Sequence, residues 1–323
     1  MPLTCYLKRN SLRCNNILLC IISTGLIFIT SCTNALSNDD EPYFPKPMKE
    51  GVAYVFDIEA IPEINITIKS DDWNLLLEKY DANKYVKDYI KCDFSFNKNG
   101  KTTHISEDGL KLHGNTSRIR PEGVIGQKHD ECAKFNHCHY MVNLRKYVKD
   151  DEHELEGVRK MNLKWFHNDP SYVREIYCYD LFKRYNIWTI SDCSYCRISL
   201  QVNEETPVYL GVYGMFETVD KQYLNRRKEL FGSSSGFLWK CTGVGLNDIS
   251  DNLFSIDDNT VDHPYELKEE TDEFDAAKEQ FQSFINKFQT LEGESFINWI
   301  ESVCDVNLLL KTYAVNVAVG MWD

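Results

Sequence analysis

The sequence predicts an α+β fold, with a β-rich N-terminal half and a helical C-terminal half. Before residue 217, several segments alternate apolar and polar residues with the period of two that is typical of strands. After residue 262, apolar residues recur at helical spacing. Strands in one stretch followed by helices in the next are the pattern of α+β domains. Hydrophobic residues make up 43% of the chain, which is enough to build the core of a large domain.

The predicted strands are short and are separated by polar turns. They cover residues 52–66, 89–96, 104–105, 110–113, 140–147, 161–164, 195–202 and 207–217. The sequence Asn97-Lys98-Asn99-Gly100 is typical of a hairpin turn, because Asn and Gly tolerate positive φ angles. A segment rich in Gly, Ser, Asn and Asp, residues 232–262, is predicted to be a linker.

The predicted helices begin with a short one at residues 71–77, with Ser70 or Asp71 as its N-cap. A second helix is predicted from Tyr172, with Ser171 as its N-cap. Three apolar stripes then predict three C-terminal helices. The stripes are Phe274, Ala277, Phe281, Phe284, Ile285 and Phe288; Phe296, Ile297 and Ile300; and Leu309, Leu310, Tyr313, Ala314, Val317 and Met321.

The N-terminus has the features of a lipoprotein signal peptide, residues 1–31. Lys8, Arg9 and Arg13 form a positive region, and residues 17–30 form an apolar run without charge. The run is shorter than the roughly 20 residues that span a bilayer. Ile29-Thr30-Ser31-Cys32 has the form of a lipobox, which predicts that Cys32 carries a lipid. The alternative is an uncleaved helix that happens to precede a cysteine.

A flexible tether, residues 32–50, is predicted after the lipidation site because its polar composition cannot bury a core. Residues 51–323 are predicted to form one folded domain. The lipid would anchor this domain to a membrane in the cell envelope, outside the cytoplasm. The net charge of −13 argues against nucleic acid as a partner, because phosphate binding needs basic patches.

Eight cysteines lie beyond Cys32, and an even number permits disulfides in an oxidising compartment. We expect a few disulfides at most, with Cys178 and Cys304 as buried thiols within helices. A zinc site is a weaker alternative, because the candidate ligands lack a paired spacing. These candidates are His129, Cys132, His137, Cys138 and His139, or Cys193 with Cys196.

Three segments have residues suited to phosphate chemistry. The loop Gly114-Asn115-Thr116-Ser117-Arg118 follows a predicted strand and could hold a phosphate with its main-chain N–H groups and a guanidinium. Arg174 lies at the start of a predicted helix, where the helix dipole disfavours a cation, so it could face a phosphate or a carboxylate such as Asp169. Glu217 ends a glycine- and aromatic-rich strand, where it could orient a lysine or metal or simply lie at the surface.

Taken together, these segments resemble the spore coat protein H (CotH) kinase family, from about Val55 to the last residue. The matching pieces are Trp73-Asn74-Leu75-Leu76-Leu77, the Gly114–Arg118 loop, Met161-Asn162-Leu163, Val173-Arg174-Glu175, Gly211-Val212-Tyr213-Gly214-Met215-Phe216-Glu217 and Gly236-Phe237-Leu238-Trp239-Lys240. The resemblance implies an atypical protein kinase-like fold. It also implies transfer of phosphate from ATP, with Mg, to serine in secreted or surface proteins.

The resemblance implies a catalytic aspartate at Asp323. Candidates for nucleotide binding are Arg118, Lys134, Arg174, Glu217 and Lys240. The family's metal-binding Asp-x-Asp segment has no counterpart before the sequence ends, so we expect that the C-terminal part of the kinase fold is missing and that this chain is inactive. The main alternative is a non-catalytic surface binding or structural lipoprotein. A carbohydrate-binding lipoprotein ranks below both.

Overall fold

The computed structural model describes residues 3–8, 50–123, 134–150, 152–241, 249–256 and 264–321. The chain divides into two compact units. The barrel unit consists of Lys46–Tyr179 and Ser191–Thr218. The helical unit consists of Met1–Pro45, Asp180–Ile190 and Val219–Asp323.

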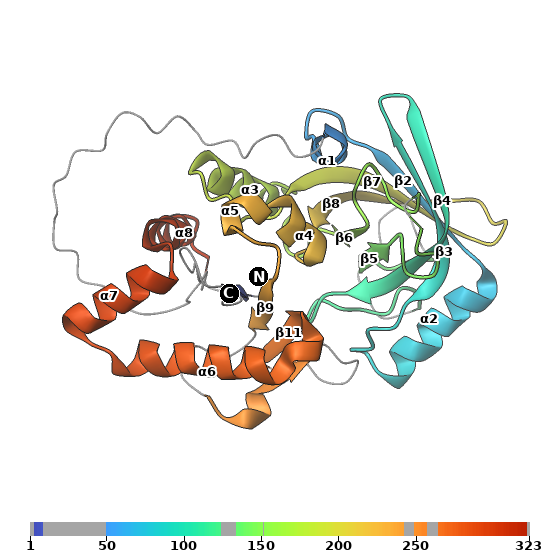
Figure 1. The fold of residues 1–323 in the computed structure, drawn as a ribbon. Coiled ribbons are helices and arrows are strands. Elements are labelled where there is room, and N and C mark those ends of the chain that lie inside the picture. The colour runs from blue at the N-terminus through green and yellow to red at the C-terminus, as the bar shows by residue number, and fades with distance from the viewer. Residues whose placement is uncertain are drawn as a thin grey trace. The chain divides into compact units, whose positions relative to one another are not determined.

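The barrel unit is a closed β-barrel with the strand order β2-β3-β4-β5-β6-β8-β7 (Figure 1). Its strands are β2 (Glu63–Ile68), β3 (Ile90–Lys98), β4 (Lys101–His113), β5 (His139–Asn143), β6 (Lys160–Lys164), β7 (Cys193–Val202) and β8 (Val208–Glu217). Only the β2–β7 pair that closes the barrel is parallel; the other neighbours are antiparallel. Closure leaves no exposed sheet edge.

The predicted hairpin is confirmed, since β3 and β4 are joined through Asn99 at φ 52° and Gly100 at φ 77°. The prediction of two short strands after this turn is wrong. Residues 104–113 belong to a single strand that begins at Lys101 and stays paired across a bulge. Glu107 has a φ of 60° near this bulge, and its N–H donates to Asp93. Because the bulge interrupts the alternation of apolar and polar residues, the sequence pattern predicted two short strands where one continuous strand is present.

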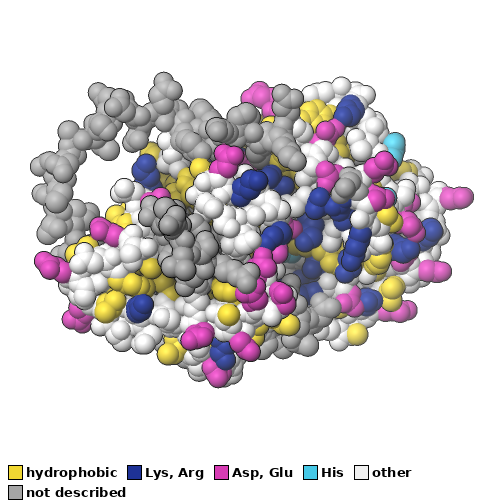
Figure 2. Space-filling view, viewed as in Figure 1, with side chains coloured by type: hydrophobic (Ala, Val, Ile, Leu, Met, Phe, Trp, Pro, Cys, Tyr) yellow, Lys and Arg dark blue, Asp and Glu magenta, His cyan; other side chains and the backbone are white. Residues whose placement is uncertain are grey.

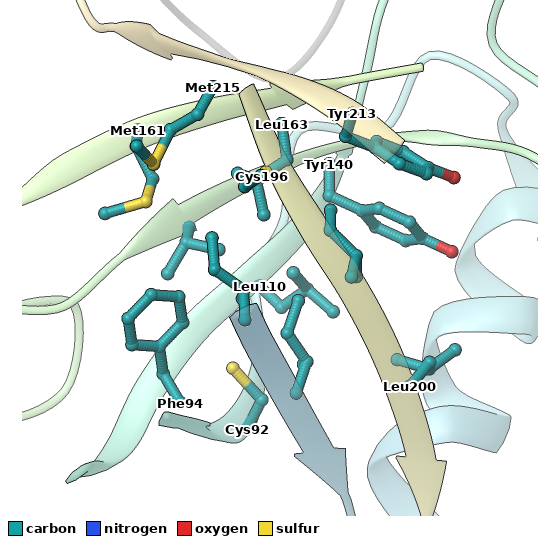
Figure 3. Close-up of a cluster of buried hydrophobic side chains, with 14 of the residues drawn as sticks. Cys92, Phe94, Leu110, Tyr140, Met161, Leu163, Cys196, Leu200, Tyr213 and Met215 are labelled. Atoms are coloured by element: carbon teal, nitrogen blue, oxygen red, sulfur yellow. The ribbon is translucent and has the colours of Figure 1, made fainter. Parts of the chain in front are cut away.

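The barrel interior is filled with side chains (Figure 3). Cys92, Phe94 and Leu110 lie in the same cluster as Tyr140, Met161, Leu163, Cys196, Leu200, Tyr213 and Met215. All of them are buried, because alternate residues of each strand point inward. The interior is therefore a packed core, and a ligand of this unit has to bind on its outer surface.

Three helices begin in the barrel unit. They are α1 (Glu50–Phe56), α2 (Ser70–Ala82) and α3 (Arg174–Arg184). The prediction of strand from residue 52 is wrong for α1, where Val52, Val55 and Phe56 are buried at helical spacing. The predicted N-caps of α2 are also wrong, because the cap is Lys69 and makes no side-chain capping bond. At α3 the Asp169 carboxylate accepts from the Arg174 N–H at 2.9 Å.

The helical unit contains a sheet of its own with the order β1-β9-β11-β10. Its strands are β1 (Leu3–Lys8), β9 (Gly236–Cys241), β10 (Phe254–Ile256) and β11 (Tyr265–Glu269). Strands thus continue to residue 269, and the expected division into a β-rich and a helical half is not what is observed. The predicted linker contains β9 and β10, because buried aromatic residues such as Trp239 and Phe254 form part of a core.

The three predicted C-terminal helices are present as α6 (Phe274–Thr290), α7 (Gly293–Val303) and α8 (Val306–Ala318). Two short helices, α4 (Lys221–Arg226) and α5 (Lys228–Phe231), precede β9, and short 3-10 turns occupy Asp251–Leu253 and Thr271–Glu273. Phe281 of α6 stacks on Trp239 with ring centroids 5.4 Å apart. This contact joins the apolar stripe of α6 to the sheet of the helical unit.

The strand β1 lies within the predicted signal peptide. It pairs antiparallel with β9, from Leu3 opposite Cys241 to Lys8 opposite Gly236. The predicted apolar region, Cys32 and almost all of the tether lie outside the described residues. Signal-peptide cleavage and lipidation therefore stay predictions. Among the described helices, none combines the length and apolar character needed to cross a membrane.

Candidate functional site: a cationic row on the barrel

Three basic residues from three neighbouring strands lie side by side on the outer surface of the barrel. His113 at the end of β4 is the direct partner of His139 at the start of β5. Tyr140 pairs with Leu163 in the next strand pair, so the antiparallel register brings His139 next to Lys164 at the end of β6. Tyr140 and Leu163 point inward, and the alternation directs their neighbours outward. We call His113, His139 and Lys164 the cationic row.

The two histidines of the cationic row are strongly disfavoured as cations. Burial, followed by the charges of Lys164 and His167, lowers the pKa of His139 to about 3. Burial, Lys164, Lys111 and His139 lower the pKa of His113 well below its usual value. The Nδ1 atom of His139 is buried and has no hydrogen-bond partner among the described residues. The two imidazoles are therefore neutral mainly because they are buried, and one buried ring nitrogen of the row has no partner among the described residues.

One carboxylate lies against the cationic row. The Lys164 ammonium is 2.5 Å from Oε1 of Glu175, in the first turn of α3. The same ammonium lies 4.7 Å from the centroid of the Phe216 ring on β8. These two contacts fix the end of the Lys164 side chain above the sheet, because both of its neighbours belong to regular elements.

Two further lysines extend the basic surface along β4. The Nζ atoms of Lys111 and Lys146 lie 4.7 Å and 5.0 Å from the centroid of the Tyr89 ring. The Tyr89 hydroxyl donates to Sδ of Met141 on β5 at 3.1 Å. Figure 2 shows Lys and Arg side chains gathered in the area where Figure 1 labels β5 and β6. A basic surface on a chain of net charge −13 favours an anionic ligand at this face.

Arg118, a predicted nucleotide contact, is buried and holds its own loop together. Its Nε donates to the Gly114 carbonyl at 3.0 Å, and its NH1 donates to the carbonyls of Lys84 at 3.3 Å and Val86 at 2.9 Å. Lys134 is instead at the surface, 2.5 Å from the carboxylate of Glu205. Arg118 therefore has a structural role in its loop, and Lys134 forms an ion pair with Glu205 at the surface.

The next two predicted contacts, Arg174 and Glu217, lie on elements that flank the cationic row. Arg174 is the first residue of α3, and its side chain is 73% exposed, with Nε 3.7 Å from the Asp169 carboxylate. Glu217 ends β8, is buried, and accepts from the Asp192 N–H at 3.0 Å. Arg174 is therefore available to a ligand beside Glu175, whereas Glu217 closes the end of a strand.

The remaining predicted residues lie elsewhere. Lys240 belongs to β9 of the helical unit, with Nζ 3.6 Å from the buried carboxylate of Glu266, which also contacts Lys268 at 3.0 Å. Asp323 and Cys32 lie outside the described residues. The structure thus places Arg174 next to Glu175, which contacts Lys164, whereas Glu217 pairs with Met161 three residues before Lys164 on β6. It gives no geometry for the predicted catalytic aspartate.

Sequence reasoning missed the cationic row as a unit. The sequence indicated His139 only as a candidate metal ligand, and Lys164 only as part of the candidate segment that leads to Arg174. Within the described residues, no group of three or more His, Cys, Asp or Glu side chains is arranged to hold a metal ion. His129 and Cys132 lie outside the described residues, and the free thiols include Cys92, Cys138, Cys178 and Cys196. The available signal was the alternation in each strand, which directs all three basic residues outward.

Comparisons with known proteins were made on the whole chain. The model of the CotH kinase protein family matches residues 119–323. The Gly114–Arg118 loop and the Trp73 helix precede this match, whereas His139, Lys164, Arg174, Glu217 and Lys240 lie inside it. Searches of curated proteins and of solved structures each found no match. Because the family model covers more than half of the sequence, the chain belongs to the CotH kinase family.

Proposed function

We propose that this chain is an exported, lipid-anchored member of a kinase family whose reaction is the transfer of phosphate from ATP to serine residues of secreted or surface proteins. Membership in the CotH kinase family supports the phosphotransfer chemistry. The signal-peptide pattern that ends at Cys32 supports export and anchoring in the cell envelope. The protein substrate and the membrane are then its partners, and ATP with Mg its cofactors.

The observation that carries the proposal is the cationic row, to which we assign the phosphate groups of ATP. The donor set fits this ligand, because an ammonium and two imidazoles suit phosphate oxygens and the buried Nδ1 of His139 lacks a partner. Bound ATP supplies the phosphoryl group, and Mg would neutralise charge between the phosphates. We assign Mg no ligands among the described residues.

The chain's own residues then hold and orient the anion. Lys164 offsets negative charge on the phosphate oxygens, and its contact with Glu175 limits its freedom. Arg174 lies next in sequence to Glu175 and is exposed enough to reach a bound anion. We assign Asp323 the role of accepting the proton of the substrate serine. The remaining predicted nucleotide contacts are Lys134, Arg118, Glu217 and Lys240, although the contacts described above for these residues are with protein groups.

The experiment uses the full chain with radiolabelled ATP, magnesium and a serine-rich protein acceptor. We expect ATP binding, and any phosphoserine formed should disappear in Lys164→Met and Asp323→Asn. Lys160→Met is the matched control, because Lys160 lies on the same strand and the same outward face. It should bind and transfer as the wild type does.

Binding and transfer discriminate between the candidate functions. ATP binding that is lost in Lys164→Met but retained in Lys160→Met supports the assignment of the cationic row. Equal binding by both variants refutes that assignment. A wild-type chain that binds no ATP refutes the kinase proposal and favours the non-catalytic lipoprotein. Magnesium-dependent phosphoserine formation by this chain would show that the expectation of inactivity is wrong.

A further inference from the structure

We propose that anion binding at the cationic row is coupled to proton uptake, with His113 and His139 neutral in the free protein and protonated when phosphate oxygens occupy the row. The inference rests on the proposed function, since it concerns how the same site binds ATP. It makes the site pH-sensitive: the affinity for ATP rises as the solution becomes more acidic.

The first step of the argument is the geometry of the pair. His113 and His139 are direct cross-strand partners, and residues directly opposite each other on one face lie about 5 Å apart at Cβ. Lys164 is the next residue across the sheet from His139. The Lys164 side chain is 25% exposed, so an anion at this face can contact its ammonium next to the buried ring of His139. The buried Nδ1 of His139 is a polar atom that such a ligand could satisfy.

The second step is the set of charges that face the two rings. The groups that act on His113 are Lys164, Lys111, His139 and Arg118, and those that act on His139 are Lys164 and His167. Trp165 contributes a neutral ring whose centroid is 6.3 Å from that of His139. Glu175, on α3, faces the row through its contact with Lys164. Burial is the main reason that the pKa values of both histidines are lowered, and the charged groups that act on the rings are basic and lower them further.

The third step is the effect of an anion. A phosphate group at the row adds an opposite charge within a few ångströms of both rings, and this favours the protonated form that the lysines disfavour. Protonated imidazole donates from both nitrogens, whereas the neutral ring donates from one. For each proton taken up, the affinity for the anion changes by up to about tenfold per pH unit. This holds between the pKa of the histidine in the free protein and its pKa in the complex.

The experiment is calorimetric titration of the full chain with ATP at pH 6, in buffers of different ionisation enthalpy, and again with inorganic tripolyphosphate. We expect the wild type to take up about one to two protons more per ligand than His113→Asn/His139→Asn. ATP has a titrating phosphate of its own, but its contribution is common to both proteins. His104→Asn is the matched control, because His104 is exposed on the same strand as His113. It should match the wild type.

A second measurement keeps the test independent of how the variants fold. In wild-type protein, the ring signals of His113 and His139 in an NMR pH titration should move to a higher pKa when tripolyphosphate is added, while His104 stays unchanged. Ligand binding with unchanged histidine titration overturns the inference and leaves the kinase proposal intact. Absence of binding by the wild type across pH 5–8 overturns both.

Discussion

The ammonium of Lys164 lies 2.5 Å from the Glu175 carboxylate, so the cationic row on β6 is tied to the first turn of α3. Glu175 opposes the charge that a bound anion would meet. Glu175→Gln should therefore raise the affinity for tripolyphosphate about fivefold, the effect of roughly 1 kcal/mol at low salt. Calorimetry at two salt concentrations measures this. Asp180→Asn, which breaks the exposed pair with Arg184 on the same helix, should leave the affinity unchanged.

Asp108 on β4 is a buried carboxylate whose two oxygens have no hydrogen-bond partner in the part of the chain that the structure describes. Burial, opposed in part by His153 and assisted by Asp93, raises its pKa from 3.8 to about 7. In the unfolded chain the group loses its proton near pH 4, whereas in the folded protein it keeps that proton until about pH 7. The free energy of unfolding should therefore fall as the pH rises from about 4 to 7, and change no further above that range.

Asp108→Asn removes this titration. The variant should be more stable than the wild type by about 1–3 kcal/mol at pH 8, and the difference should shrink towards pH 4. Urea unfolding at several pH values measures it. Glu63→Gln, at an exposed position of β2, serves as the control and should follow the wild-type profile. A wild-type stability that is constant from pH 4 to 7 would contradict the burial argument.

Lys98 has a fully buried side chain at the end of β3. Its ammonium donates to the Asp57 carbonyl at 2.7 Å and lies 5.4 Å from the centroid of the Tyr54 ring, and burial lowers its pKa. Because burying the ammonium is costly, Lys98→Met should cost less than about 1 kcal/mol, since methionine keeps the packing of the stem. Lys98→Ala should cost about 2–4 kcal/mol, because it leaves a cavity. Equal costs in urea unfolding would show that the charge, and not the packing, stabilises this site.

Lipidation at Cys32 predicts a defined processing event in a bacterial host. Wild-type chain should incorporate labelled fatty acid and lose residues 1–31, as measured by intact mass, whereas Cys32→Ser should do neither. Cys20→Ser lies inside the predicted signal peptide and should be processed normally. An intact wild-type chain without a lipid would instead mean that β1 stays in the mature protein.

The strand β1 supplies a structural readout of the same event. It pairs with β9 over six residues, from Leu3 opposite Cys241 to Lys8 opposite Gly236. A chain that begins at Cys32 lacks this partner, so the edge of β9 loses half of its main-chain hydrogen bonding. Amide hydrogen exchange along Gly236–Cys241 should be faster in the processed chain than in the full one. Equal exchange would show that another segment covers this edge.

The sequence correctly predicted the elements whose pattern lies within a few consecutive turns or residues of the chain. The Asn99-Gly100 turn was predicted because its backbone needs positive φ angles, and the three C-terminal helices because their apolar stripes extend over many residues. The signal failed at α1, where a short run containing Val52, Val55 and Phe56 fits a strand or a helix equally well. It failed again at β4, where a bulge interrupts the alternation of one continuous strand.

The sequence by itself determined the mixed α+β character, the family and the pattern of an exported lipoprotein. Composition, motif order and periodicity depend only on the order of residues along the chain, and not on contacts between distant segments. Only the tertiary structure decided that His113, His139 and Lys164 form one site. These residues come from three separate strands, and the register of two antiparallel pairings sets their neighbours. Strand register depends on the packed barrel core, which couples residues far apart in the chain.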